Sequence, residues 1–251
     1  MSRSYRAVLF DLFDTLVRFD RDRLPLVRVN GREVRSSLGR LYEVLSPSAP
    51  QVTLEALQGA LSASWKEAER LRAIDHREVG APERFAYLFQ CLSLDPEACA
   101  PGLITTLIET HRAELAKAVQ FLPQHRALLD DLRSRYRMAV VSNFDYTPTA
   151  LAILRAAGIV EHFETIVVSD AVGWRKPAPL IFRQTLDRMG LEAGETLFVG
   201  DRIDIDVAGA SAMGMDSAWI NPEVEPIPPG LMPPTYELRD LADLRGILIA
   251  S

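Results

Sequence analysis

Short, uninterrupted apolar runs recur along most of this chain. Runs that are continuous rather than alternating are typical of strands covered by helices on both faces. They predict strands at Ala7–Phe10, Met138–Val141, Thr165–Val168, Thr196–Val199 and Ser217–Ile220. After residue 118 these runs alternate with segments of helical length, which is the pattern of a parallel α/β sheet.

Helical periodicity fills the intervals between the predicted strands. The sequence predicts helices at Gln124–Arg135, Thr147–Ala157, Pro179–Met189 and Asp206–Ala212. Glycines 158, 190 and 214 stand where three of these helices would end. After a proline-rich stretch, we expect a small edge strand at residues 236–238 and a closing helix at residues 240–248.

Residues 19–118 have a different pattern, because amphipathic helices replace the strand-like runs. One apolar stripe follows a helix that Thr53 is placed to cap, and a second stripe follows a later helix. The stripes consist of Leu54, Leu57, Leu61, Trp65, Ala68 and Leu71, and of Ile104, Leu107, Ile108, His111 and Leu115. Asn30-Gly31 suits the turn of a hairpin. We therefore expect a Rossmann-like core at residues 1–18 and 119–251, interrupted by a helical domain at residues 19–118.

Composition and charge narrow the possible functions. The chain has 251 residues, 48% of them hydrophobic and 25% charged, with a formal net charge of −6. This acidic balance disfavours binding to nucleic acid, which needs a basic surface. No apolar run approaches the length of a membrane span. A small molecule is therefore the expected partner, and the chain is expected to act as a monomer or a homodimer.

The cysteines and the N-terminal residues indicate in which cellular compartment the protein is expected. Cys91 and Cys99 are the two cysteines, and they lack metal-ligand spacing. We interpret both as buried, reduced side chains. Residues 1–5 lead directly into the first predicted strand without a signal-peptide core. These features favour a cytoplasmic protein.

Polar residues follow the predicted strands at four places. They are Asp11 with Thr15, Ser142 with Asn143, Lys176 before Pro177, and Gly200-Asp201 with Asp206. The carboxyl ends of parallel strands lie at one edge of a sheet, where ligands bind in open α/β folds. We therefore expect Asp11, Ser142 and Asp201 to converge on one site.

In this order, the four places resemble the motifs of the haloacid dehalogenase-like hydrolase superfamily. The resemblance covers residues 5–17 and about 120–250. It implies that Asp11 is the nucleophile that forms an aspartyl-phosphate, and that Lys176 offsets negative charge. It also implies that Ser142, Asn143 and Thr15 hold the phosphoryl group. The helical insertion corresponds to the family's substrate-selecting cap.

The resemblance further implies a magnesium site. Asp11, Asp201 and the main-chain oxygen of Phe13 correspond to its ligands, and Asp206 would orient Lys176 or the metal's waters. Mg²⁺ prefers oxygen ligands and keeps several waters, so a few protein oxygens are enough. A divalent cation also suits the reaction, because an aspartate can attack an anionic phosphate monoester only when negative charge is neutralised.

Phe13 is a departure from the family pattern. Most phosphatases of the family carry at this position a second aspartate, which acts as general acid. Asp14 comes one residue later, where it is expected to cap the turn after the first strand. Since general-acid assistance is worth about a hundred- to ten-thousandfold, we expect a slow phosphatase or one that prefers activated leaving groups.

Two other functions remain open at this stage. The family's metal-independent 2-haloacid dehalogenases also have an aromatic residue at the position of Phe13, but they typically lack the pair seen here as Gly200-Asp201. A non-catalytic protein that binds a metabolite or a partner is the third possibility. The main expectation is a magnesium-dependent phosphatase acting on a small phosphorylated metabolite.

Overall fold

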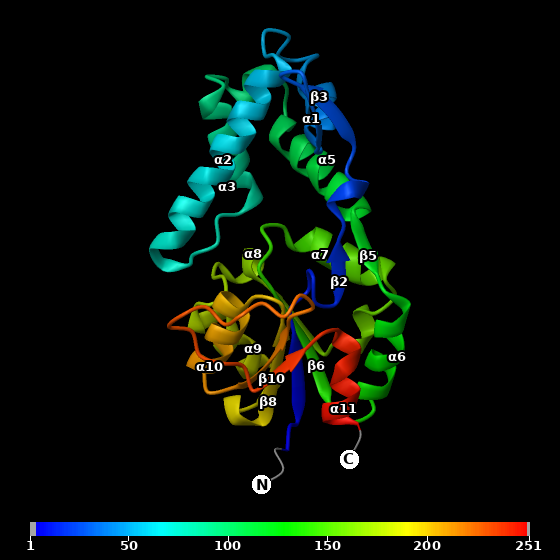
Figure 1. The fold of residues 1–251 in the computed structure, drawn as a ribbon. Coiled ribbons are helices and arrows are strands. Elements are labelled where there is room, and N and C mark those ends of the chain that lie inside the picture. Colours follow the sequence, from blue (N-terminus) through cyan, green and yellow to red (C-terminus); the bar gives the residue numbers. More distant parts are fainter. Residues whose placement is uncertain (1–3, 250–251) are drawn as a thin grey trace. The chain divides into compact units, whose positions relative to one another are not determined.

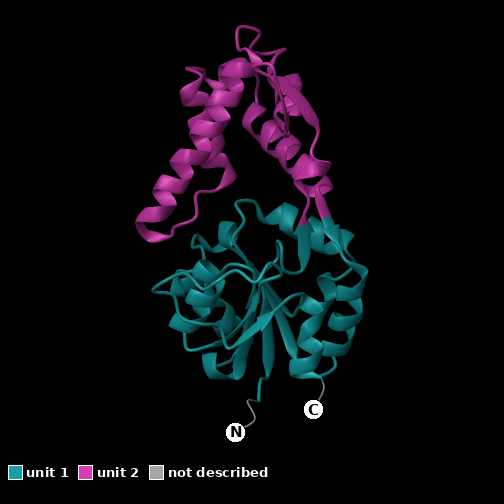
Figure 2. Cartoon of the chain, viewed as in Figure 1, with its two compact units in different colours: residues 1–18, 120–251 teal, residues 19–119 magenta. Residues whose placement is uncertain are grey.

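The chain divides into two compact units. The structure is a computed structural model that describes residues 4–249. Residues 1–18 and 120–251 form the first unit, called the core unit here, and residues 19–119 form the second, the helical unit (Figure 2). Residues 1–3, which belong to the N-terminal stretch without a signal-peptide core, lie outside the described residues.

A six-stranded sheet forms the centre of the core unit (Figure 1). Its strands are β1 (Ala7–Phe10), β6 (Arg137–Ser142), β7 (Thr165–Val168), β8 (Thr196–Gly200), β9 (Asp216–Ile220) and β10 (Tyr236–Leu238). Their order is β10-β9-β8-β1-β6-β7, and neighbouring strands pair in parallel. The predicted α/β fold is therefore confirmed, and β10 lies at the edge as expected.

Helices cover both faces of this sheet. They are α6 (Pro123–Leu132), α7 (Thr147–Ala156), α8 (Ser169–Val172), α9 (Pro179–Met189), α10 (Ala208–Ala212) and α11 (Leu244–Leu248). Figure 1 shows α9 and α10 on one side of the sheet, and α6 and α11 on the other. On the first side, Ile181 and Phe182 pack in one apolar cluster with Leu9 and Ala139 of the sheet. Burial on both faces explains why the strands are continuous apolar runs.

The helix predicted at residues 206–212 begins earlier than expected. A π-helical turn, η4 (Ile203–Val207), precedes α10. The main-chain nitrogen of Asp206 donates to the Arg202 carbonyl at 2.7 Å, and its carboxylate accepts from the Arg202 main-chain nitrogen at 3.1 Å. These two contacts tighten the chain around Asp206, which therefore lies inside the turn rather than at its start.

The helical unit contains five α-helices and a hairpin within the described residues. The helices are α1 (Leu38–Leu45), α2 (Leu54–Asp75), α3 (Ala81–Cys91), α4 (Pro96–Cys99) and α5 (Leu103–Lys117), and a 3-10 turn, η1, spans Arg21–Arg23. The hairpin pairs β3 (Leu26–Val29) with β4 (Arg32–Arg35), and its turn residues Asn30 and Gly31 have positive φ as expected. Two segments join the units, β2 (Val17–Phe19) and β5 (Val119–Phe121), and they pair with each other.

The buried side of α2 differs from the predicted stripe. Its buried residues are Leu57, Ala60, Ser64, Ala68 and Arg72, whereas Trp65 is 48% exposed. Thr53 caps the helix as predicted, through a bond from the Ala56 main-chain nitrogen. The placement of Trp65 on the buried stripe was wrong, because α2 instead buries Arg72, whose charge Glu78 neutralises, together with mostly small side chains.

The cysteines also differ from expectation. Both are free, but Cys91 is exposed and Cys99 is half-buried, so their interpretation as buried side chains was wrong. Cys91 is the last residue of α3 and is not among the residues that this helix buries. Among residues 4–249, no helix combines the length and apolar character that crossing a membrane requires.

Candidate active site

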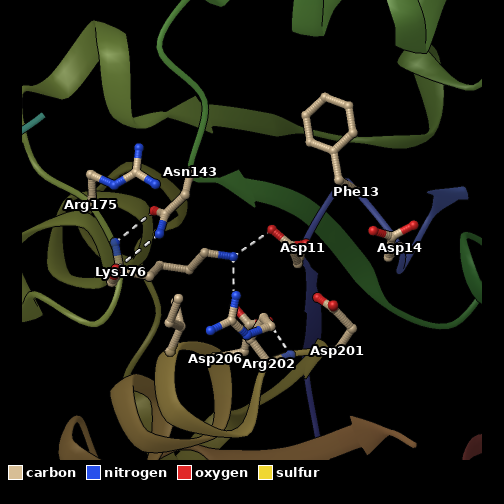
Figure 3. Close-up of a pocket in the computed structure, with 10 residues that line it drawn as sticks. Asp11, Phe13, Asp14, Asn143, Arg175, Lys176, Asp201, Arg202 and Asp206 are labelled. Atoms are coloured by element: carbon tan, nitrogen blue, oxygen red, sulfur yellow. Dashed lines mark hydrogen bonds and ion pairs between the residues drawn. The ribbon is translucent and has the colours of Figure 1, made fainter. Parts of the chain in front are cut away.

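A pocket of about 210 Å³ lies at the carboxyl ends of the central strands in the core unit (Figure 3). Strand β1 lies between β8 and β6, so the chain order changes direction there, and such a switch point is where open α/β sheets bind ligands. The pocket is lined by Asp11, Phe13, Asp14, Asn143, Arg175, Lys176, Asp201, Arg202, Ile205 and Asp206.

Asp11 is the first residue after β1. Its main-chain nitrogen donates to the Val199 carbonyl of β8 at 2.9 Å, which fixes the start of the loop against the neighbouring strand. Its carboxylate is nearly buried and accepts from the Lys176 ammonium at 2.6 Å. Burial raises the pKa of Asp11 to about 6, against the opposing effect of Lys176.

Lys176 is buried between two carboxylates. Its Nζ lies 2.6 Å from Asp11 Oδ1 and 2.7 Å from Asp206 Oδ1 (Figure 3). Burial lowers the pKa of Lys176, but the charges of Asp11 and Asp206 outweigh this effect and keep that pKa above its ordinary value. The ammonium is therefore charged when it faces the site.

Asn143 holds the main chain of Lys176. Its Oδ1 accepts from the Lys176 main-chain nitrogen at 2.7 Å, and its Nδ2 donates to the Lys176 carbonyl at 2.9 Å. The peptide bond between Lys176 and Pro177 is cis. Sequence reasoning placed Asn143 against the phosphoryl group; in the structure the same side chain lines the pocket and fixes the lysine loop.

Three carboxylates cluster beside this lysine. Ligand atoms of Asp11, Asp201 and Asp206 all lie within 4.8 Å of one another. Burial, together with the charges of Asp11 and Asp206, raises the pKa of Asp201 to about 8. A Cβ on Gly200 would lie 2.3 Å from Asp206 Oδ2, so only glycine fits before Asp201.

This cluster fits a magnesium ion. Carboxylate oxygens are the donors that Mg²⁺ prefers, and three negative charges against one ammonium leave a surplus for a divalent cation to neutralise. Asp206 is the least available of the three, because Lys176 and the Arg202 main-chain nitrogen already engage its two oxygens. Over the whole pocket, four aspartates and three cationic side chains give a formal charge of −1, which one divalent cation changes to +1.

Two predicted phosphate-binding residues lie behind the pocket lining. Ser142, at the end of β6, and Thr15 are both buried and do not line the pocket. Within residues 4–249, neither side-chain hydroxyl has a hydrogen-bond partner. A buried hydroxyl without a partner is uncommon and calls for an explanation such as a ligand.

Phe13 and Asp14 form the wall opposite Lys176 in Figure 3. The Phe13 ring lies against Phe144, with ring centroids 4.9 Å apart. Asp14 has a φ of 57°, and its main-chain nitrogen donates to the Val17 carbonyl at 2.6 Å. Its main chain thus forms part of the turn after β1, its side chain lines the pocket, and the cap expected of that side chain stays a prediction.

Sequence reasoning missed Arg175 and Arg202. Both arginines line the pocket beside motif residues. The Arg202 guanidinium is held by the exposed Asp204, with contacts of 2.9 and 3.1 Å. Their positions directly before Lys176 and after Asp201 were the available signal, since neighbours of site residues often share the same rim.

Comparison with known proteins places the fold and the motifs in one family. A family model described as haloacid dehalogenase-like hydrolase matches residues 5–214. The chain is 26% identical to the HAD-hydrolase YfnB of Bacillus subtilis (strain 168) over 249 residues, which cover 98% of this chain and 96% of YfnB. A solved structure of YfnB bound to magnesium matches with a TM-score of 0.65 at 24% identity, covering 98% of this chain and 99% of that one.

Two other similar proteins are named for different reactions. The glyceraldehyde 3-phosphate phosphatase of Pyrococcus abyssi (strain GE5 / Orsay) is 33% identical over 148 residues, or 57% of this chain and 60% of that relative. The 2-haloacid dehalogenase of Pseudomonas syringae pv. Tomato DC3000 has a TM-score of 0.73 at 23% identity, covering 98% of this chain and 99% of that one. Structural similarity at this level of identity establishes the fold, so the choice of reaction depends on the site.

Proposed function

The chain belongs to the haloacid dehalogenase-like hydrolase family, and on this basis we propose that it is a magnesium-dependent phosphomonoesterase. Its substrate is a small phosphorylated metabolite, and the reaction passes through an aspartyl-phosphate on Asp11. The observation that carries the proposal is the surplus of carboxylates around Lys176. A divalent cation bound by these carboxylates adds positive charge to the pocket, which favours binding of an anionic substrate.

Asp11 is the nucleophile in this proposal. A carboxylate oxygen of Asp11 bonds to the phosphorus as the bond to the leaving oxygen breaks, and water then hydrolyses the aspartyl-phosphate. Lys176 holds Asp11 Oδ1 at 2.6 Å and so orients the carboxylate. Its charge also offsets the negative charge that accumulates on the phosphoryl oxygens.

Asp11, Asp201 and the main-chain oxygen of Phe13 would hold Mg²⁺. When bound, the ion supplies charge neutralisation at the phosphoryl group. Asp206 keeps Lys176 in place through the contact at 2.7 Å. Because Phe13 would contribute only a main-chain atom, its aromatic side chain leaves this ligand set intact.

Ser142, Asn143 and Thr15 are the proposed phosphoryl-binding residues. The two buried hydroxyls without partners support this role, because each can donate a hydrogen bond to an oxyanion. Asn143 contributes mainly by fixing the lysine loop.

The leaving group is where this protein differs from most phosphatases of its family. Phe13 cannot donate a proton, so the departing oxygen must be stable as an anion or must take its proton from water. We propose a preference for activated leaving groups, such as aryl oxides, over simple alkoxides.

The helical unit is the proposed cap that selects the substrate. It is inserted between the Asp11 loop and the strand that ends at Ser142, with the proposed domain at residues 19–118. The compartment proposed for this enzyme is the cytoplasm, and a monomer or homodimer is the proposed assembly.

Metal-independent hydrolytic dehalogenation is the second candidate. Phe13 favours it, because the family's 2-haloacid dehalogenases also have an aromatic residue at this position. The carboxylate surplus opposes it, because buried carboxylates without a cation are costly. In the third reading, a non-catalytic binding protein, ligand binding would survive Asp11→Asn and no turnover would occur.

One paired assay separates these possibilities. Purified protein is incubated with p-nitrophenyl phosphate, with Mg²⁺ or with a chelator, and in parallel with 2-chloropropionate. The proposal expects phosphate release that the chelator abolishes. Halide release that the chelator leaves unchanged would instead establish the dehalogenase, and no release from either substrate would favour the binding protein.

A further inference from the structure

Trp219 connects strand β9 to the carboxylate cluster. The indole is 3% exposed, and its Nε1 donates to the main-chain carbonyl of Asp201 at 2.8 Å. A buried indole N–H needs a partner, so this bond is strongly preferred over an unpaired alternative. Asp201 follows β8 directly, and Trp219 pairs with Gly200 in the register of β8 and β9. The contact therefore fixes the main chain at the point where the Asp201 side chain leaves the sheet.

The same ring also packs on the turn that carries Asp206. Trp219 forms an apolar cluster with Ile203 and Val207, the first and last residues of η4. Leu231, from the proline-rich segment, packs on this cluster. One side chain thus contacts both segments that supply carboxylates to the site beyond Asp11.

The spacing around Asp206 leaves little tolerance for movement of these segments. Asp206 Oδ2 occupies the space where Gly200 would carry a side chain, and Lys176 contacts its other oxygen at 2.7 Å. A shift of the Asp201 loop would change the separation of the clustered oxygens, which now lie within 4.8 Å. Small shifts matter because Mg²⁺ demands near-octahedral geometry.

We propose that Trp219 is a positioning residue for the metal site: its N–H holds the Asp201 carbonyl while its ring supports η4, so that the carboxylates stand ready for one divalent cation. The inference rests on the proposed magnesium site. Groups that orient metal ligands typically contribute about 10–100-fold to metal affinity, and this one acts through the main chain. We therefore expect that losing this bond lowers the affinity for Mg²⁺ by about tenfold, the lower end of that range.

The test uses Trp219→Phe, which removes the N–H and keeps an aromatic ring. Two quantities are measured over a magnesium titration of the full-length protein: the rise in melting temperature and the rate of p-nitrophenyl phosphate hydrolysis. The Mg²⁺ concentration for half-maximal effect should increase about tenfold in both measurements. The rate at saturating Mg²⁺ should stay within about threefold of the wild type, because Trp219 touches no reacting group.

Trp65→Phe is the matched control, since Trp65 lies exposed on the helical unit. It should leave the magnesium titration unchanged. If Trp219→Phe folds poorly, site-specific incorporation of 3-benzothienylalanine at position 219 replaces the N–H by sulfur in a ring of nearly the same shape, and the same tenfold shift is expected.

The outcomes separate this inference from the proposed function. A wild type that responds to Mg²⁺, with a position-219 variant that has the same half-saturation, overturns the role of Trp219 and leaves the metal site standing. A lower melting temperature alone, with unchanged half-saturation, also overturns it. A wild type that shows neither stabilisation nor turnover with Mg²⁺ overturns the metal site and this inference together.

Discussion

The core unit and the helical unit both bury charged side chains, but they balance these charges differently. In the helical unit, the buried Arg72 meets the buried Glu78 at 2.8 Å and the exposed Glu69 at 2.7 Å, and it also donates to the Val79 carbonyl, so one buried cation faces one buried carboxylate. In the core unit, one buried lysine serves Asp11 and Asp206 while Asp201 lies in the same cluster.

The unbalanced carboxylates of the core unit change the pKa of Asp201. Burial and the charges of Asp11, Asp206 and Asp14 raise the pKa of Asp201 to about 8. A balanced buried pair is typical of a structural contact, whereas an unbalanced buried cluster in a pocket is typical of a functional site. The difference agrees with the proposal that the carboxylate cluster of the core unit binds a divalent cation.

Asp11→Asn should have the largest effect on turnover. The amide is a poor nucleophile, so the rate of p-nitrophenyl phosphate hydrolysis with Mg²⁺ should fall by roughly 10⁴-fold or more. The folded state should persist, because asparagine has nearly the same shape. A folded variant that keeps more than a tenth of the wild-type rate would exclude Asp11 as the nucleophile.

Lys176→Met and Arg72→Met test the comparison of the two units directly. Each substitution removes the cation from a buried ion pair, which typically costs about 3–5 kcal/mol of stability. Lys176→Met should also lower kcat by about 10²–10³-fold, since it removes charge stabilisation at the reacting group. Urea unfolding and rates at saturating Mg²⁺ measure both effects.

The two variants should lose a similar amount of stability, but only Lys176→Met should lose much of its kcat. Arg72→Met should keep kcat of the folded protein within a few-fold of the wild type. Equal losses of kcat in both variants would contradict the division into a structural pair and a catalytic cluster.

Phe13→Asp restores the acid found in most phosphatases of the family. Turnover of a simple alkyl phosphate should rise by about ten- to a hundredfold, because general-acid assistance matters most for poor leaving groups. Hydrolysis of p-nitrophenyl phosphate should change much less. Phe13→Asn provides a polar side chain without an acid, and a similar gain in that variant would refute the general-acid explanation.

The smallest predicted effect is on stability as a function of pH. The folded protein without metal binds the Asp201 proton more tightly than the unfolded chain, because its pKa is about 8 against an ordinary 3.8. The associated stability is therefore complete below about pH 4 and is lost as the pH rises through about 8. Relative to Asp201→Asn, the metal-free wild type should lose melting temperature as the pH rises between these limits.

Magnesium should reverse this loss in the wild type only. Metal binding displaces the proton, so the stabilisation by Mg²⁺ should grow with pH over the same interval. Thermal scans of the wild type and of Asp201→Asn at several pH values, with Mg²⁺ and with chelator, provide the measurement. A magnesium effect of the same size in the variant would contradict the assignment of Asp201 as a ligand.

Much of the core unit was predictable, because strands that are buried on both faces are continuous apolar runs in the sequence. Ala7–Phe10 and Thr165–Val168 were predicted with the bounds that the structure has, as was the helix Pro179–Met189 between its proline and Gly190. The convergence of Asp11 and Asp201 followed from the parallel order of the strands.

What failed depended on packing between distant segments. Trp65 was placed in the core because large apolar residues were counted, yet α2 buries small residues and a paired arginine. The hydrogen bonds of Asn143 to Lys176 were not predicted, because they join residues 33 positions apart in the chain. The contact of Trp219 with Asp201 has no local sequence signal, since it depends on the register of β8 and β9.

The central claim is that a divalent cation in the carboxylate cluster allows Asp11 to accept a phosphoryl group. Mass spectrometry of protein quenched in acid during turnover of p-nitrophenyl phosphate tests it most directly. The account predicts that the peptide containing Asp11 gains one phosphoryl group with Mg²⁺ and none with chelator. An unmodified Asp11 during active turnover, or an Asp11 ester formed from 2-chloropropionate in the presence of chelator, would contradict it.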